Sequence, residues 1–62
     1  MERQKGNEFI KSKEYQLAVD CYTKSIEIDP KEAFTYANRS MAYLKMKSFN
    51  AAIDDANSAI EL

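Results

Sequence analysis

The residues that could support catalysis are few in this chain of 62 residues. Asp54 and Asp55 are its one adjacent pair of carboxylates. On a helix, neighbouring side chains point ~100° apart, so these two carboxyl groups cannot share a proton as a catalytic dyad. Cys21 is the single cysteine and there is no histidine, which leaves no nucleophile–base pair and only one thiol for zinc. Because a glycine-rich phosphate loop is also missing, we predict no enzyme activity, no metal site and no cofactor.

A polar residue in the middle of the chain is a better candidate for recognition. Small and apolar residues around it recur at steps of three and four, which is typical of one face of a helix. They are Ala33, Tyr36, Ala37, Ser40, Tyr43 and Leu44. Asn38 lies on a different stripe of the same segment, which it shares with Phe34, Met41 and Lys45. We expect this helix to pack through the first stripe and to meet something else through the second.

Composition and charge argue against several other classes of protein. Nine basic and ten acidic residues give a net charge of −1, which favours neither nucleic acid nor an anionic membrane. No stretch of ~18 apolar residues could span a bilayer, and the N-terminus lacks the apolar core of a signal peptide. Cys21 has no second cysteine to pair with, which favours a reducing compartment. We therefore expect a soluble, cytoplasmic domain.

Helices are the elements that must position these residues. The chain has one glycine, Gly6, and one proline, Pro30, and it is rich in Ala, Lys, Glu and Ile. Such a composition predicts an all-α fold with short connections. The predicted helices cover residues 2–12, 15–28, 32–46 and 49–61. Asp29 is the expected cap of the third helix, with Pro30 in its first turn, and Ser48 is the expected cap of the fourth.

An internal repeat organises these helices. When the chain is shifted along itself by 34 residues, identical or similar residues coincide at many positions. The identical pairs are Lys11 and Lys45, Lys13 and Lys47, Ala18 and Ala52, Asp20 and Asp54, Ile26 and Ile60, and Glu27 and Glu61. The similar pairs include Phe9 and Tyr43, Ile10 and Leu44, Tyr15 and Phe49, and Val19 and Ile53. Each unit is a helical hairpin that cannot bury its own apolar face, so neighbouring hairpins must stack.

This pattern resembles the tetratricopeptide repeat, whose period is about 34 residues. The resemblance rests on Gly6-Asn7, Phe9, Tyr15, Ala18-Val19, Tyr22, Ser25-Ile26 and Pro30, and on Tyr36, Ser40, Tyr43, Phe49, Ala52-Ile53, Ala56 and Ala59-Ile60. It implies one domain, residues 1–62, in which two antiparallel helix-turn-helix hairpins stack as an α-solenoid. The first repeat is expected at about 1–32 and the second at about 33–62. Glu2 departs from the pattern, since the family usually has a large apolar residue there.

Part of the pattern resembles a narrower group, the carboxylate-clamp modules of co-chaperones. Gly6-Asn7 and the run 36–40, Tyr-Ala-Asn-Arg-Ser, carry this resemblance. Such modules bind the C-terminal Glu-Glu-Val-Asp tail of a heat-shock chaperone in a concave groove. The resemblance implies that Arg3, Asn7 and Asn38 contact the carboxylates of such a tail, which need several converging donors. Arg3 stands where the family usually has lysine, and it keeps the charge.

Four further residues are predicted to contribute to the peptide-binding surface. Ile10 and Met41 are expected to form its apolar floor, and Lys11 and Lys45 to add charge at its rim. The family takes two more basic residues of the clamp from the first helix of a third repeat, which would begin after Leu62. We therefore expect this sequence to be a fragment of a longer module.

A structural scaffold is the alternative function. In this interpretation the repeats only stack, and their open edge packs on a partner helix or on a second copy of the chain. The edge is expected to be formed by Ala52, Ala56, Ala59 and Leu62. The aromatic residues Phe9, Tyr15, Tyr22, Tyr43 and Phe49 are interpreted as packing residues, since aromatics at helical spacing usually lie in a core.

Overall fold

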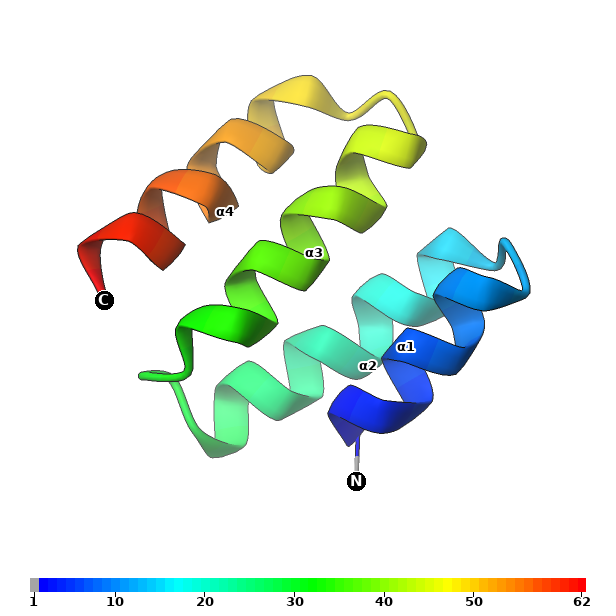
Figure 1. Cartoon of the computed structure of the whole chain (residues 1–62), viewed down its shortest axis with the longest axis horizontal. Helices are drawn as coiled ribbons and strands as arrows, with labels where there is room; N and C mark the ends of the chain where they lie inside the picture. The colour runs from blue at the N-terminus through cyan, green and yellow to red at the C-terminus, as the bar shows by residue number, and fades with distance from the viewer. Residues whose placement is uncertain (1) are drawn as a thin grey trace.

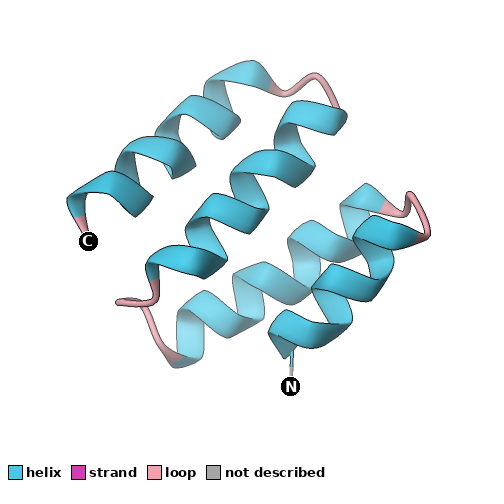
Figure 2. Cartoon of the chain, in the orientation of Figure 1, coloured by secondary structure: helices cyan, strands magenta, loops and turns pink. Residues whose placement is uncertain are grey.

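The computed structural model describes residues 2–62 and, from Gln4 onward, their side chains. The chain forms four helices: α1 (Glu2–Lys11), α2 (Tyr15–Ile28), α3 (Ala33–Lys45) and α4 (Phe49–Glu61). No strand occurs in residues 2–62 (Figure 2). The predicted all-α fold is therefore confirmed, and the predicted helix ends differ from the observed ones by at most one residue.

The four helices form two antiparallel hairpins that lie side by side as a thin plate. Its principal extents are 29 × 26 × 13 Å. Figure 1 shows α3 between α2 and α4, with α1 lying along α2. Helix α3 packs extensively on α2 but touches α1 only slightly, and among the helices α4 packs on α3 alone. This is the stacked arrangement of hairpins that the internal repeat predicts.

The turns within the two hairpins have the same backbone structure. Lys13 and Lys47, which are 34 residues apart, both have positive φ values, 62° and 63°. After α1, the N–H of Lys13 bonds to the carbonyl of Ile10, and the N–H of Glu14 bonds to the carbonyl of Phe9. Lys47 and Ser48 make the equivalent bonds after α3. Both helices thus end in a Schellman motif, which satisfies their last carbonyl groups and reverses the chain.

The connection between the hairpins differs from the prediction. Asp29 does not cap α3; it follows the last residue of α2, and its N–H bonds to the carbonyl of Ser25. Its carboxylate accepts the N–H of Lys31 at 3.3 Å, within the turn that contains Pro30. Proline disfavours a helical conformation in the preceding residue, which explains why α2 ends at Ile28. Helix α3 begins only at Ala33, after this turn, with Glu32 at its N-cap position. Ser48 does occupy the N-cap position of α4, but its hydroxyl makes no capping hydrogen bond.

The core lies where α2 meets α1 and α3. Ala18, Val19, Tyr22 and Ala42 are buried, and Phe9, Ile10, Tyr43 and Met46 pack against them. Close approach of α1 and α2 depends on Gly6, because a Cβ atom there would lie 2.5 Å from Cε1 of Tyr22. In the second hairpin, the hydroxyl of Ser40 donates to the carbonyl of Ala52 at 2.7 Å. Small residues therefore set the spacing of the helices in both hairpins.

The open edge of α4 agrees with the prediction only in part, since Leu62 is exposed as expected. Ala52 is buried, because it lies at the closest approach of α4 to α3. Phe49, which was expected to pack, is mostly exposed, as are Ile53, Ile60 and Leu62. Val19 on α2 is 4% exposed, whereas its repeat counterpart Ile53 is 57% exposed. Helix α3 covers this face of α2, and no described helix covers the same face of α4.

Candidate functional site

Two asparagines from different hairpins meet on the face shared by α1 and α3. Asn7 lies in the second half of α1 and Asn38 near the middle of α3. The Nδ2 atom of Asn38 donates to Oδ1 of Asn7 at 3.4 Å. Asn7 is exposed and Asn38 is half-buried, so both amides are accessible from outside. The structure therefore brings together two of the predicted binding residues, which are 31 positions apart in the sequence.

A buried tyrosine of α2 also contacts this pair. The hydroxyl of Tyr22 donates to Oδ1 of Asn7 at 2.5 Å. Burial raises the pKa of Tyr22, and the neighbouring Cys21 raises it further, so the phenol keeps its proton at neutral pH. The amide oxygen of Asn7 thus accepts from two side chains, and its amide nitrogen bonds to no acceptor among residues 4–62.

The other predicted binding residues surround the amide pair to different degrees. The side chain of Arg3 lies outside the described residues. Ile10 is half-buried and packs against the core, which leaves only part of it for a ligand. Met41 is half exposed, on the stripe of α3 that carries Asn38.

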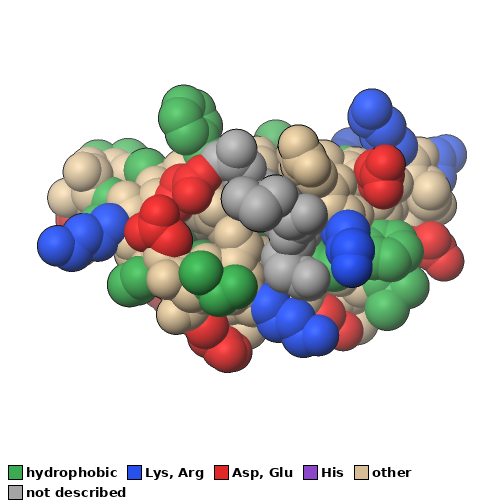
Figure 3. All heavy atoms as spheres, turned by 90° about the horizontal axis from the view of Figure 1, so that it is seen from below, with side chains coloured by type: hydrophobic (Ala, Val, Ile, Leu, Met, Phe, Trp, Pro, Cys, Tyr) green, Lys and Arg blue, Asp and Glu red, His purple; other side chains and the backbone are tan. Residues whose placement is uncertain are grey.

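The two rim lysines are exposed at equivalent places. Lys11 ends α1 and Lys45 ends α3, so both lie in the last turn of a first helix. Neither forms an ion pair with a residue that the structure describes, so both charges are available to an anion. Seen from the end where α1 begins, however, basic, acidic and apolar side chains are interspersed, as the net charge of −1 implies (Figure 3).

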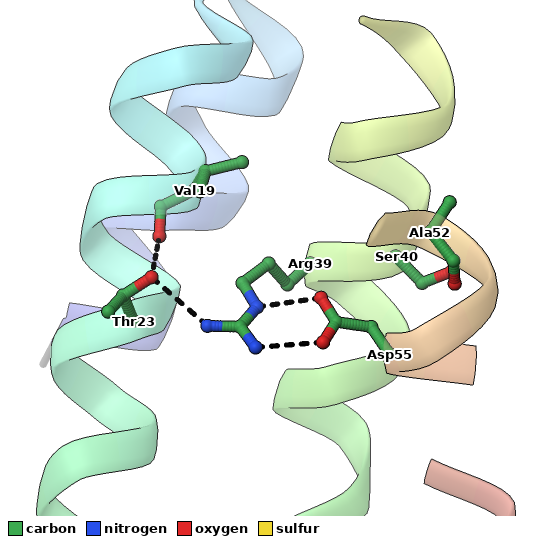
Figure 4. Close-up of polar contacts among 6 residues, drawn as sticks. All are labelled: Val19, Thr23, Arg39, Ser40, Ala52 and Asp55. Carbon is green, nitrogen blue, oxygen red and sulfur yellow. Dashed lines mark hydrogen bonds and ion pairs between the residues drawn. The ribbon is translucent and has the colours of Figure 1, made fainter. Parts of the chain in front are cut away.

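Another polar cluster, centred on Arg39, was not predicted from the sequence. Arg39 of α3 binds Asp55 of α4 through two hydrogen bonds, Nε to Oδ2 at 2.7 Å and a terminal nitrogen to Oδ1 at 2.8 Å. Its other terminal nitrogen donates to the hydroxyl of Thr23 at 3.1 Å, and that hydroxyl donates to the carbonyl of Val19 (Figure 4). The hydrogen bonds that Arg39 donates to Asp55 raise the pKa of Arg39, although burial acts in the opposite direction. Arg39 is thus a structural residue that ties three helices together.

The internal repeat contains a signal that could have revealed this ion pair. Lys5 and Cys21 stand in the first repeat where Arg39 and Asp55 stand in the second. The positive charge is present in both units, as Lys5 and Arg39, so the new charge of the second unit is the carboxylate of Asp55 in place of Cys21. A carboxylate gained at one position, with a basic residue at the other, is a signal for an ion pair between the two helices. The buried carboxylate of Asp55 is therefore occupied by Arg39, while Asp54 is exposed.

Comparison with known families agrees with this architecture. Two family models, both described as tetratricopeptide repeat, match the chain, one over residues 3–32 and the other over residues 35–62. The chain belongs to the tetratricopeptide repeat family. Its repeats are a non-catalytic protein-interaction module. Among the residues that the structure describes, no cluster of side chains could hold a metal ion and no helix is long and apolar enough to cross a membrane.

Known proteins contain tetratricopeptide segments similar to this one. The chain is 42% identical to human serine/threonine-protein phosphatase 5 over 57 residues, which cover 92% of the chain and 11% of that protein. It is 41% identical to RNA polymerase II-associated protein 3 of Xenopus laevis over 61 residues, 98% of the chain and 9% of the relative. It is 38% identical to small glutamine-rich tetratricopeptide repeat-containing protein 2 of Saccharomyces cerevisiae, over 97% of the chain and 17% of the relative. The tetratricopeptide chain thus spans a small part of each.

Proposed function

We propose that this tetratricopeptide chain is a peptide-binding adaptor of the co-chaperone type. Its α1–α3 face would receive the C-terminal carboxylates of a heat-shock chaperone tail that ends in Glu-Glu-Val-Asp. The observation that carries the proposal is the meeting of Asn7 and Asn38 on this face, through a bond between two side chains from different repeats. The proposed setting is the cytoplasm, where the chaperones and a single reduced cysteine would both be found.

The amide pair has the chemistry that a terminal carboxylate requires. The contacts with Tyr22 and Asn38 occupy the oxygen of Asn7, so its nitrogen is the atom left to donate outward. Hydrogen bonds from neutral donors to a carboxylate are charge-assisted and stronger than bonds between neutral groups. Arg3, one helical turn before Asn7, would supply the positive charge that balances the ligand.

The surroundings of the amides suit the rest of such a tail. Met41 is 50% exposed and Phe34 is 74% exposed, and both share the stripe of α3 that carries Asn38. These apolar surfaces could bury the valine side chain next to the terminal aspartate. Lys11 and Lys45 would attract the glutamates that precede it. A negatively charged tail with one apolar residue therefore fits this face.

Peptide binding with and without the terminal charge tests the proposal. We expect an acidic peptide ending in Glu-Glu-Val-Asp to bind at least tenfold more tightly than the same peptide with an amidated C-terminus, because a hydrogen bond to a charged group contributes about 1.5–3 kcal/mol. Asn38→Ala should remove most of this preference. Asn57→Ala, which changes an exposed asparagine on α4, is the matched control and should leave it unchanged. The proposal is contradicted if neither amidation of the peptide nor Asn38→Ala changes the affinity.

A second function is favoured by the edge of α4. Ile53 and Ile60 are 57% and 83% exposed there, and they flank a surface whose counterpart on α2 is covered by α3. In this proposal the chain is a scaffold that stacks on a partner helix or on another copy of itself. Sedimentation over a concentration series tests the self-association. A strict monomer at high concentration would exclude the second copy as the occupant of this edge.

A further inference from the structure

The hydroxyl of Tyr22 is a buried polar group that the packing of the hairpin does not require. The ring of Tyr22 lies in the core, against Gly6 of α1. Its hydroxyl donates a hydrogen bond to Asn7, the residue that follows Gly6. We propose that Tyr22 is a positioning residue of the carboxylate site, which turns the amide of Asn7 so that its nitrogen faces the ligand. This inference rests on the proposed function and adds a residue that has no contact with the peptide.

The phenolic proton of Tyr22 is shielded from solvent and needs an acceptor within the protein. Tyr22 is 1% exposed, so bulk water cannot readily replace Asn7 as the hydrogen-bond partner of its hydroxyl. Oδ1 of Asn7 is the acceptor that the structure gives to this proton among the described residues. If the amide were turned round, the phenol would face an N–H group and its own proton would be left unpaired. Burial of an unpaired donor is unfavourable, so Tyr22 selects the orientation with the oxygen inward.

The orientation of Asn7 then determines that of Asn38. With the oxygen of Asn7 turned inward, Asn38 must offer its nitrogen to make the bond between the two side chains. Both amides then have N–H groups left for an anion. In the reverse orientation the oxygen of Asn7 would face the ligand and repel a carboxylate. One buried hydroxyl thus determines how both amide groups are oriented.

The adjacent Gly6 makes the arrangement possible. The ring atoms Cδ1, Cε1 and Cζ of Tyr22 lie within 2.5–2.9 Å of where a Cβ of Gly6 would be. Any larger residue would displace the ring and withdraw the hydroxyl from Asn7. The dipeptide Gly6-Asn7 therefore combines the contact surface for the ring with the acceptor for its hydroxyl.

A double-mutant cycle tests the inference. Tyr22→Phe keeps the ring and removes the hydroxyl, and Tyr15→Phe is the matched control, since the hydroxyl of Tyr15 makes no hydrogen bond with a residue that the structure describes. Each change is made in the unsubstituted chain and in Asn7→Ala. Affinities for the acidic and the amidated Glu-Glu-Val-Asp peptides are measured by NMR titration, which also reports that each variant is folded.

We expect Tyr22→Phe to weaken binding of the acidic peptide three- to tenfold, the size of a single hydrogen bond, and to change binding of the amidated peptide less than twofold. In the Asn7→Ala background the effect of Tyr22→Phe should disappear, and Tyr15→Phe should have none in either. If Tyr22→Phe weakens binding equally with and without Asn7→Ala, or equally for both peptides, Tyr22 is not a positioning residue. The proposed function is unaffected by that result. An unsubstituted chain that does not distinguish the two peptides overturns the proposed function itself.

Discussion

The helices of the first hairpin meet where the ring of Tyr22 lies against Gly6, whereas those of the second meet where the hydroxyl of Ser40 bonds to the carbonyl of Ala52. Gly6 and Ser40 occupy the same position of the 34-residue repeat. A small residue is needed there in both hairpins, but only glycine leaves room for a tyrosine ring. The shared position thus determines the approach of the helices, and the residue opposite decides what else the hairpin does.

The polar groups of the two hairpins differ in a related way. Tyr22 directs its hydroxyl to Asn7 on the exposed face, while Arg39 and Asp55 bind each other between α3 and α4. Under the proposed function, the first hairpin would present its polar group to a ligand. The second hairpin uses its polar groups to hold α2, α3 and α4 together.

Among the substitutions that compare the two hairpins, loss of the Asp55 carboxylate should reduce the free energy of unfolding most. Asp55→Ala leaves the half-buried guanidinium of Arg39 without its carboxylate, which should cost about 3 kcal/mol of unfolding free energy, the lower end of the range for a buried pair. Urea denaturation followed by circular dichroism measures the loss. At the equivalent position of the first hairpin, Cys21→Ala should cost less than about 1 kcal/mol.

A combined replacement separates the ion pair from simple packing. Arg39→Met with Asp55→Leu removes both charges and should recover most of the stability lost in Asp55→Ala, because a buried pair can often be replaced by apolar residues. A loss under about 1 kcal/mol for Asp55→Ala would contradict the structural role of this pair.

Gly6→Ala should come next in size. The added methyl group would overlap the ring of Tyr22, and overpacking of this kind typically costs about 1–3 kcal/mol. This cost should exceed the gain of ~1 kcal/mol that alanine brings to a helix. Ser40→Ala in the second hairpin should lose about 1 kcal/mol, the value of one hydrogen bond. A Gly6→Ala chain that is more stable to urea than the unsubstituted chain would contradict the close approach of α1 and α2.

Val19 and Ile53 occupy the same position of the two repeats, on a covered face of α2 and an open face of α4. Truncation of each side chain to alanine should distinguish the two faces. Val19→Ala removes two methylene equivalents from a buried site, which corresponds to about 1.6 kcal/mol. Ile53→Ala removes more apolar surface, but from an exposed site, and should cost less than about 0.5 kcal/mol. Equal costs in urea denaturation would show that the α4 edge is covered in solution, as the scaffold function requires.

High pH should produce the smallest effect. Because burial raises the pKa of Tyr22, the unfolded chain loses its phenolic proton at a lower pH than the folded chain does. The contribution of this group is complete below the ordinary tyrosine pKa of 10.0 and is lost as the pH rises through the higher folded value. Thermal unfolding between pH 9 and about 11 should therefore show a steeper loss of stability in the unsubstituted chain than in Tyr22→Phe. Parallel curves would contradict the burial of this hydroxyl.

The sequence predicted those features that depend on local pattern and repetition. Helix ends followed from periodicity and from polar breaks, and the stacking of hairpins followed from the 34-residue shift. The cap at Asp29 was wrong because a local motif could not show where the chain would turn around Pro30. Ala52 was wrongly placed at the open edge because a small apolar residue is equally suited to a surface stripe and to a close helix contact.

The site was accessible to the sequence only in part. Asn7 and Asn38 were predicted as binding residues through the family resemblance, and the structure adds the hydrogen bond between them. The contacts of Tyr22 with Asn7 and of Arg39 with Asp55 were missed because they join residues 15 and 16 positions apart, on the two helices of one hairpin. The periodicity of a single helix does not predict such contacts. Asn7 has Met41 as its repeat counterpart and Asn38 has Gln4, so the amide pair is not part of the repeated pattern either.

The most direct test of the account follows the side-chain amide signals of Asn7 and Asn38 by NMR during titration with the two peptides. The acidic Glu-Glu-Val-Asp peptide should shift both signals, since both amides would donate to its terminal carboxylate. The amidated peptide should shift neither at the same concentration. Shifts confined to the edge of α4, around Ile53 and Ile60, would contradict a carboxylate site on the α1–α3 face.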